Sequence, residues 1–257
     1  MKREERRQAI MDLLVEDRAV ELDALAERFA VSRMTIHRDL DDLEQAGLLR
    51  KVRGGATIEA GTRFESDFRV RERQDAAAKT RMARAALDLV EPGMTVMVND
   101  GSMAGLLGSL LPEKRPLTVI SNNGAVIDRL RGEAGITLIA TGGVYSPKFN
   151  AFLGIVTEEA LLRMRADIAF ISSPAVSGLQ AFHMDEAVVR AKRAMMDGAQ
   201  RRCLLVNHSR FGRTALHLLA DLSAFDTIMT DDAPEPDARA ALERAGLSLT
   251  IAMGDTE

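Results

Sequence analysis

The sequence predicts an α/β fold, with a small helical region at the N-terminus and a larger region built on a mainly parallel sheet. The chain has 257 residues, 46% of them hydrophobic, so it can bury a substantial core and is long enough for two domains. Near the N-terminus, apolar residues recur at helical spacing. Farther along, mostly apolar runs end in small polar residues and lead into helical segments, as in parallel strands covered by helices on both faces.

Two helices are predicted first, over residues 4–16 and 20–29, where apolar side chains stand among charges at helical intervals. A third helix follows Ser32, a residue type that caps helix N-termini, and continues to Gln45, before Gly47 stops it. The side chains of this third helix that face inward are expected to be Ile36, Leu40 and Leu43.

Residues 48–58 predict two short strands joined at Gly54-Gly55, which form a β-hairpin, or wing. With the three helices, this hairpin makes residues 1–58 a winged helix-turn-helix domain. Residues 59–74 are polar and show little periodicity, so we expect a linker or an extended arm there. The second, α/β domain should occupy residues 75–257.

The second domain is expected to begin with a helix and to contain a sheet whose strands are buried on both faces. Its strand-like runs are mostly apolar throughout and do not alternate with polar residues, which favours a parallel sheet. The predicted strands are residues 95–98, 117–120, 137–140, 168–171, 203–206, 227–230 and 247–252.

The composition narrows the possible functions. The formal net charge is −4, so a nucleic-acid interface must depend on a local arrangement of charges. The absence of Trp and the single Tyr argue against a surface that stacks the bases of RNA or single strands. No apolar run reaches about 18 residues and the charged start lacks the apolar stretch of a signal peptide, so we expect a cytoplasmic protein that does not interact with a membrane.

No metal site, cofactor or catalytic set is predicted. The single cysteine, Cys203, cannot form an internal disulfide, and its apolar neighbours indicate a core position. His183, Asp185 and His208 stand at spacings that fit no zinc or nucleophilic-triad pattern, so we interpret the histidines as surface or hydrogen-bonded residues.

The third helix carries donors suited to reading duplex DNA. In a helix-turn-helix, the second helix of the pair lies in the major groove and its outer face contacts base edges. With the apolar stripe turned inward, His37 and Arg38 point outward, and Arg38 is the best candidate for a guanine or phosphate contact. Ser32 and Thr35 suit backbone phosphates near the helix N-terminus. The candidate DNA-contacting residues of the helix and the wing are Ser32, Arg33, Thr35, His37, Arg38, Arg50, Lys51 and Arg53.

The alternative for this region is a small three-helix bundle with a solvated charged face. Four acidic residues of the third helix favour it, namely Asp39, Asp41, Asp42 and Glu44. However, these acids lie towards the C-terminal half of the helix, whereas the bases lie towards its N-terminal end and on the wing. DNA docking favours that polarity, so we expect DNA binding.

The N-terminal sequence resembles the DeoR-type regulators. The likeness rests on Arg7-Gln8-Ala9-Ile10, on residues 21–32, on Met34-Thr35-Ile36-His37-Arg38-Asp39-Leu40 and on Arg53-Gly54-Gly55-Ala56. The family usually has Thr-Ile-Arg-Arg-Asp-Leu in the recognition helix, so His37 stands where the first arginine is expected. The resemblance implies double-stranded operator DNA as a partner, with an altered sequence preference and a weaker contact at this position while His37 is neutral.

Polar segments follow four of the predicted strands, at the edge where ligands bind in open parallel sheets. Amides, hydroxyls and carboxylates there suit sugar hydroxyls, while backbone N–H groups with Lys192 or Arg210 suit a phosphate. Since Gly, Ser and Asn are also ordinary turn residues, a purely structural rim is the alternative. The candidate effector-binding residues are Asn99, Asp100, Gly101, Ser102, Ser121, Asn122, Asn123, Gly142, Gly143, Lys192, Asn207 and Arg210.

This second region resembles the DeoR-type sensor domain, which is related in fold to ribose-5-phosphate isomerase and the CoA transferases. Lys192-Arg193-Ala194-Met195 matches a family motif closely. Asn99-Asp100-Gly101-Ser102 resembles Asp-x-Gly-Thr-Thr, and residues 207–212 resemble Asp-x-Ser-Lys-Phe-Gly, with Asn99, Asn207 and Arg210 as departures. The resemblance implies a small phosphorylated sugar as effector, and these departures bear on which one.

We therefore predict a transcriptional regulator, a repressor of carbohydrate metabolism genes that is controlled by a phosphorylated sugar or sugar alcohol. One winged helix covers too few base pairs for operator specificity, so we expect a homodimer or homotetramer on repeated half-sites. The alternative is an enzyme of the sugar-phosphate isomerase type that carries a helix-turn-helix. Its acid and base groups would come from Asp100, Asp185, Glu186 and Lys192.

Overall fold

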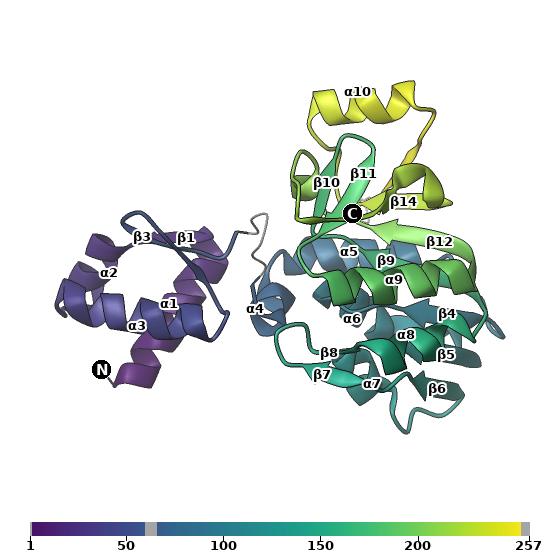
Figure 1. Ribbon diagram of the computed structural model, residues 1–257, viewed down its shortest axis with the longest axis horizontal. Helices are drawn as coiled ribbons and strands as arrows, with labels where there is room; N and C mark the ends of the chain where they lie inside the picture. Colours follow the sequence, from purple (N-terminus) through teal and green to yellow (C-terminus); the bar gives the residue numbers. More distant parts are fainter. Residues whose placement is uncertain (1, 60–65, 253–257) are drawn as a thin grey trace. The chain divides into compact units, whose positions relative to one another are not determined.

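The computed structural model describes residues 2–59 and 66–252 and divides the chain into two compact units, Met1–Gln74 and Asp75–Glu257 (Figure 1). Each unit has hydrophobic core residues of its own. The division falls at the C-terminal end of the segment expected to be a linker. Within the described ranges, no helix is both long and apolar enough to cross a membrane.

The first unit contains the three helices that the sequence predicts, α1 (Arg3–Asp17), α2 (Leu22–Phe29) and α3 (Arg33–Gln45). Their apolar faces meet in one core, to which α3 contributes the expected stripe of Ile36, Leu40 and Leu43. Helix α2 begins two residues later than predicted, because residues Ala19–Glu21 form strand β1 instead.

The wing is a three-stranded antiparallel sheet in the order β1-β3-β2, with β2 at Arg50–Val52 and β3 at Gly55–Thr57. Gly54 makes the turn with a φ of 82°, a conformation that favours glycine. At Gly55, an added Cβ would lie 1.9 Å from the carbonyl oxygen of Val20 on β1. Glycine at position 55 therefore allows β1 to pair with β3.

Residues 66–74 were expected to belong to a linker or an extended arm, but they contain a helix, α4 (Phe68–Arg73). Asp67 caps this helix, because its side chain accepts a hydrogen bond from the Arg69 N–H. Val70 packs in the core of the first unit. The two apolar side chains of this short helix are too few to show a helical period in the sequence. The expected linker residues 60–65 lie outside the described part of the chain.

The second unit is built on a seven-stranded sheet in the order β15-β14-β12-β9-β4-β5-β6, in which every neighbouring pair is parallel. Each of the seven apolar runs forms one of these strands. Their bounds are β4 Thr95–Val98, β5 Leu117–Ser121, β6 Ile136–Ala140, β9 Ala166–Ser172, β12 Ala199–Leu205, β14 Thr227–Thr230 and β15 Leu249–Ile251.

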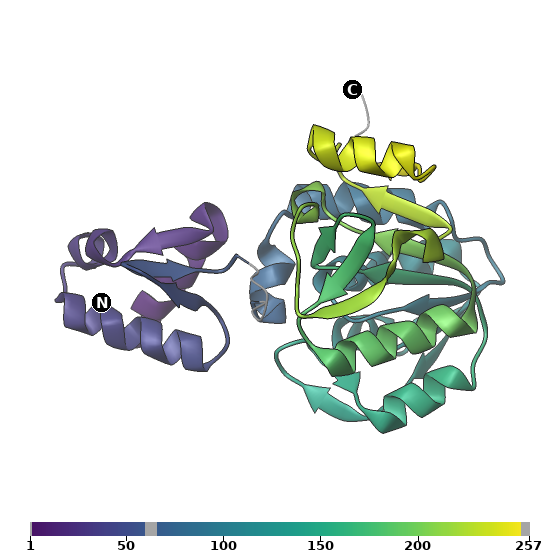
Figure 2. The same ribbon diagram turned by 45° about the horizontal axis from the view of Figure 1, so that its top comes forward.

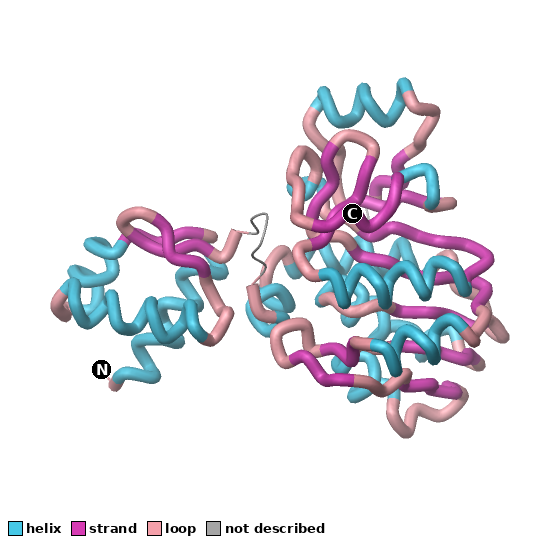
Figure 3. The backbone as a smooth tube through the Cα atoms, viewed as in Figure 1, coloured by secondary structure: helices cyan, strands magenta, loops and turns pink. Residues whose placement is uncertain are grey.

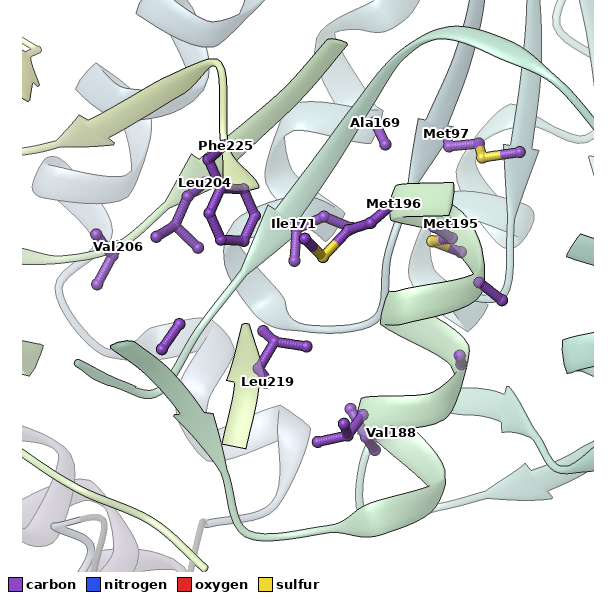
Figure 4. Close-up of a cluster of buried hydrophobic side chains, with 14 of the residues drawn as sticks. Met97, Ala169, Ile171, Val188, Met195, Met196, Leu204, Val206, Leu219 and Phe225 are labelled. Carbon is purple, nitrogen blue, oxygen red and sulfur yellow. The ribbon is translucent and has the colours of Figure 1, made fainter. Parts of the chain in front are cut away.

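Helices cover both faces of this sheet, as Figures 1 and 2 show. On one face, α8 and α9 pack against side chains such as Met97, Ile171 and Leu204, with Met195 and Met196 of α9 in the same core (Figure 4). The opposite core joins other strand residues to α5, α6 and α7. The helix bounds are α5 Ala76–Leu87, α6 Ser102–Leu110, α7 Gly124–Leu130, α8 Ile155–Leu162, α9 Glu186–Gly198 and α10 Pro236–Arg244.

Five short antiparallel strands lie outside the main sheet, and the sequence did not predict them. They form a two-stranded ribbon, β7-β8, and a three-stranded sheet, β10-β11-β13 (Figure 3). Their bounds are β7 Val144–Ser146, β8 Ala151–Leu153, β10 Ala175–Ser177, β11 Gln180–His183 and β13 His217–Asp221. Three single-turn 3-10 helices complete the unit, η1 Leu111–Lys114, η2 His208–Arg210 and η3 Leu222–Ala224.

Candidate functional site

Helix α3 has the N-terminus and outer face that the sequence predicts for a recognition helix. The Ser32 Oγ accepts a hydrogen bond from the Thr35 N–H at 3.1 Å and so caps the helix. On the outer face His37 and Arg38 are exposed, and Met34 is 62% exposed, which is unusual for a large apolar side chain. An exposed apolar side chain beside donors suits contact with the thymine methyl group.

The other basic residues predicted for DNA contact have different surroundings. Arg53 is exposed on the wing. Arg33 contacts the Asp23 carboxylate, with Nε 2.7 Å from Oδ1. Lys51 pairs with Asp41 of α3, and the hydrogen bond from Lys51 lowers the pKa of Asp41. Arg50 is half-buried, and its Nε has no hydrogen-bond partner among the described residues.

Asp39 argues against the alternative of a solvated charged face on α3, because it is buried. Its side chain is 1% exposed, and its Oδ2 lies 2.5 Å from Nε of Arg6 on α1. One signal of this burial is present in the sequence, because Asp39 lies one helical turn after Ile36 and next to Leu40, on the edge of the buried stripe.

In the second unit, the strand order reverses between β4 and β9, where ligands bind in open parallel sheets. Asn99 follows β4, and its carboxamide bonds to Ser172 at the end of β9. The Ser172 N–H donates to Asn99 Oδ1 at 3.2 Å, and Asn99 Nδ2 lies 3.3 Å from Ser172 Oγ. Gly101, with a φ of 108°, leaves room for the same hydroxyl, since a Cβ there would lie 2.7 Å from it. These contacts join the two strand ends into one polar cluster, which is largely buried.

Lys192 brings a positive charge to this polar cluster from α9. Its side chain is 2% exposed, and the Nζ donates to the Ser172 carbonyl oxygen at 2.8 Å. Nζ also lies 3.7 Å from Oδ1 of Asp100, which is itself buried. An ammonium and a carboxylate removed from water need such partners, because neither is stable in a protein interior alone.

The end of β5 and the loop after it add Ser121, Asn122 and Asn123 to this polar cluster. Asn123 Nδ2 donates to the carbonyl oxygens of Asn99 and Gly101, each at 3.0 Å, and Ser121 Oγ donates to Val98 O at 2.7 Å. Asn122 donates through Nδ2 to the Phe152 carbonyl oxygen at 3.0 Å, which fixes the orientation of its carboxamide. The Asn122 Oδ1 is buried and has no hydrogen-bond partner among the described residues. It is a free acceptor beside the switch point.

The remaining predicted effector residues lie on either side of this group. Ser102 is the first residue of α6 and is largely buried. Gly142 and Gly143 follow β6, two strands from β4, where Thr157 Oγ1 donates to Gly142 O at 2.6 Å. Asn207 and Arg210 follow β12, on the far side of β9, and Asn207 Oδ1 accepts from the Ser209 N–H at 3.0 Å as the cap of η2. The structure thus brings the β4, β5, β9 and α9 residues together.

One pair at this edge was not predicted. His208 lies at the end of β12, and its Nδ1 is 2.9 Å from Oδ2 of Asp231, a largely buried residue after β14. Asp185, one of the acid and base candidates of the enzymatic alternative, caps α9 by accepting a hydrogen bond from the Val188 N–H, and Glu186, another of them, pairs with Arg190. These contacts give both carboxylates a structural role.

Two observations bear on metal and thiol chemistry. Within residues 2–59 and 66–252, no three His, Cys, Asp or Glu side chains come together as a metal site. Cys203 is buried in the sheet, and burial raises the pKa of its thiol to about 12.

Comparison with known proteins identifies both units. Residues 6–61 match the DeoR-like helix-turn-helix domain, and residues 74–232 match the DeoR C terminal sensor domain. The chain is 31% identical over 251 residues to the uncharacterized HTH-type transcriptional regulator YgbI of Escherichia coli (strain K12), covering 98% of each chain. It is 34% identical to the L-fucose operon activator of Haemophilus influenzae, over 80% of this chain and 83% of that protein. It is 27% identical to the glycerol-3-phosphate regulon repressor of Escherichia coli (strain K12), over 92% of this chain and 93% of that protein.

Among solved structures, the chain is similar to ribose 5-phosphate isomerase A from Methanocaldococcus jannaschii, with a TM-score of 0.40 and 18% identity over 54% of this chain and 55% of that one. The chain is also similar to eIF2B beta from Chaetomium thermophilum, with a TM-score of 0.41 and 14% identity over 80% of this chain and 58% of that one. The chain spans little more than half the length of these proteins.

The sensor-domain match alone covers more than half of the chain, and the helix-turn-helix match covers most of the first unit. The relative that is 31% identical aligns along nearly its whole length. With the exposed face of α3 and the polar edge at the strand switch point, these matches show that the chain belongs to the DeoR family of DNA-binding transcriptional regulators.

Proposed function

We propose that the protein represses carbohydrate metabolism genes and that its second unit binds a phosphorylated sugar or sugar alcohol. The relatives include a repressor of the glycerol-3-phosphate regulon and an activator of an L-fucose operon. Both names refer to carbohydrate-related genes, which supports that target class. Because one of these relatives is an activator, the relatives support the class of target genes more directly than they support repression.

The free acceptor on Asn122 carries the effector proposal. A buried oxygen without a partner costs free energy of about 1–3 kcal/mol, which a ligand recovers by donating a hydrogen bond to it. A sugar or sugar alcohol supplies O–H donors, and the Asp100 carboxylate, which follows the neighbouring strand β4, is a second acceptor. The phosphate would bind to the backbone N–H groups near Ser102 at the start of α6, with Lys192 or Arg210 supplying positive charge.

For DNA, we propose that α3 lies in the major groove and that the wing holds the flanking backbone. The exposed positions of His37, Arg38 and Arg53 support this arrangement. Lys51 would act on phosphate only in part, because its ammonium already pairs with Asp41. We further propose that the protein acts in the cytoplasm as a homodimer or homotetramer, so that two recognition helices read repeated half-sites of one operator.

The enzymatic alternative finds less support. Of its candidate acid and base groups, Asp185 caps α9 and Glu186 pairs with Arg190. Lys192 and Asp100 lie close to each other, with Lys192 also bonded to the β9 backbone. The curated relatives described above are named as transcriptional regulators. We therefore propose that the protein is not an enzyme.

Calorimetric titration tests the chemical class of the effector. The panel contains sugar phosphates, sugar-alcohol phosphates and their unphosphorylated counterparts. The proposal predicts that at least one phosphate binds and that its unphosphorylated form binds at least about tenfold more weakly, as expected for the loss of charge-assisted hydrogen bonds. Replacement of Asn122 by Leu should weaken binding of that phosphate. Catalytic conversion of a panel member by the purified protein would favour the isomerase-like alternative.

A further inference from the structure

The recognition helix α3 carries more acidic than basic residues, although its outer face must approach phosphates. Its acids are Asp39, Asp41, Asp42 and Glu44, and its cations are Arg33 and Arg38. Acidic side chains facing DNA would be repelled by the backbone, and each would offset one favourable phosphate contact. Where these carboxylates point therefore decides whether α3 can dock.

Asp39 points away from the outer face, into a cluster of arginines from α1. Arg6 is itself buried, and its Nε lies 2.5 Å from Asp39 Oδ2. Arg3 and Arg7 approach the other oxygen, with their Nε atoms 3.7 and 3.6 Å from Asp39 Oδ1. A single carboxylate thus receives cations from three positions on α1.

The other acids of α3 also have partners within the unit. Asp42, one turn from Asp39, contacts the guanidinium groups of Arg3 and Arg7. Asp41 pairs with Lys51 on the wing, and Glu44 Oε1 accepts a hydrogen bond from the Lys51 N–H at 2.7 Å. The acids of α3 are therefore directed towards α1 and the wing.

Ion pairing at Asp39 also fixes how α3 is rotated about its axis. Successive residues of a helix differ by about 100° around the axis, so the direction of Asp39 determines that of its neighbour Arg38. Packing of Ile36, Leu40 and Leu43 limits the same rotation, and the contact between Arg6 Nε and Asp39 Oδ2 adds a directional restraint. Arg6 therefore narrows the rotation beyond what the apolar stripe allows by itself.

We propose that Asp39 is a positioning residue for DNA recognition: held by Arg6 on α1, it orients α3 so that Arg38 and His37 face the base edges. It contacts no DNA itself. Its contribution is to sequence-specific binding, while binding to any duplex depends on the net charge of the unit.

Replacement of Asp39 by Asn in the full-length protein separates this role from two simpler ones. The probes are the duplex that the wild-type protein enriches from a random-sequence library and a scrambled duplex of the same composition. If Asp39 acts only as a negative charge, its removal strengthens binding to both duplexes. If it acts only in stability, D39N lowers the Tm and leaves both affinities unchanged at a temperature where the variant is folded.

Our proposal predicts a third pattern, in which D39N binds the enriched duplex at least about tenfold more weakly, while its affinity for the scrambled duplex is unchanged or higher. Asp12→Asn is the matched control, because it removes one carboxylate from the same unit at a side chain that is 59% exposed. D12N should keep the ratio of the two affinities. An equal ratio in folded D39N and D12N would overturn the proposal.

Arg6→Lys gives a second test if D39N does not fold. It keeps the positive charge beside Asp39 but loses the Nε contact. We expect R6K to reduce the ratio of specific to non-specific affinity in the same direction as D39N. A wild-type ratio in R6K would contradict a role for the directed contact.

Discussion

Lys192 is a buried charged residue that has two partners at the strand switch point. Of the candidate residues, we therefore expect the loss of Lys192 to weaken effector binding most. We predict that K192M lowers affinity for the bound phosphate by about tenfold or more, since a charge-assisted contact is lost. The measurement is calorimetric titration with the phosphate that binds the wild-type protein. Lys114→Met, on η1 beyond the C-terminal end of α6, is the control and should bind that phosphate as the wild type does.

Measurements of the free energy of unfolding distinguish the structural role of Lys192 from its role in effector binding. K192M leaves the buried Asp100 carboxylate without its cation, so the free energy of unfolding should fall by about 3–5 kcal/mol. Adding Asp100→Asn removes the uncompensated charge and should restore much of the stability but not the affinity. If the double variant also recovers the affinity, the charge of Lys192 has no role in binding.

Cys203 should be chemically silent in the folded protein. Burial raises the pKa of its thiol to about 12, above its ordinary value of 9.0, so the thiolate is scarce at neutral pH. We predict that a disulfide reagent at pH 8 labels Cys203 only after unfolding in denaturant. Because the folded thiol holds its proton more tightly, the free energy of unfolding should also fall as the pH rises above about 9. Rapid labelling of the native protein would contradict this.

Individual residues show where sequence reasoning reaches its limit. The exposure of His37 and Arg38 followed from helical periodicity, and the burial of Cys203 followed from its apolar neighbours in a strand-like run. The free acceptor of Asn122 did not, because it depends on the Phe152 carbonyl of β8, thirty residues away. The pairing of His208 with Asp231 likewise joins the ends of two parallel strands that only the sheet order makes neighbours.

At the scale of elements, the wing depends on Gly55, where a Cβ would lie 1.9 Å from the Val20 carbonyl oxygen. We predict that Gly55→Ala lowers the free energy of unfolding of the first unit by more than about 2 kcal/mol, because backbone must move to relieve the contact. Gly54→Ala, where a Cβ has open space but φ is 82°, should cost about 1 kcal/mol. Chemical denaturation of both variants measures the difference, and equal losses would contradict the role assigned to β1.

The elements that the sequence predicted are those with a long, uniform pattern. All seven parallel strands were predicted because each contains a mostly apolar run, as expected for a parallel sheet covered by helices. Strands β4, β5 and β9 are buried along most of their length, whereas the edge strands β6 and β15 are only partly buried. The missed strands outside the main sheet are three to five residues long and belong to antiparallel pairs. Strand β1 was missed because its Val20 also continues the apolar spacing of α2.

In the complete protein, the proposed regulation requires more than one chain on one operator. We predict that light scattering of the protein with the enriched duplex gives the mass of at least two chains per DNA, because one α3 contacts only a half-site. A single chain bound at saturation, on a duplex that contains two half-sites, would contradict the proposed assembly.

Fluorescence anisotropy tests the central claim, that this is a DNA-binding regulator controlled by a sugar phosphate. The enriched and scrambled duplexes are titrated at two salt concentrations, with and without the phosphate that binds in calorimetry. We expect tight, sequence-selective binding whose affinity the phosphate changes, since an effector must bind the DNA-competent and DNA-incompetent states with different affinity. Weak, salt-sensitive binding that is equal on both duplexes and unaffected by the phosphate would contradict it.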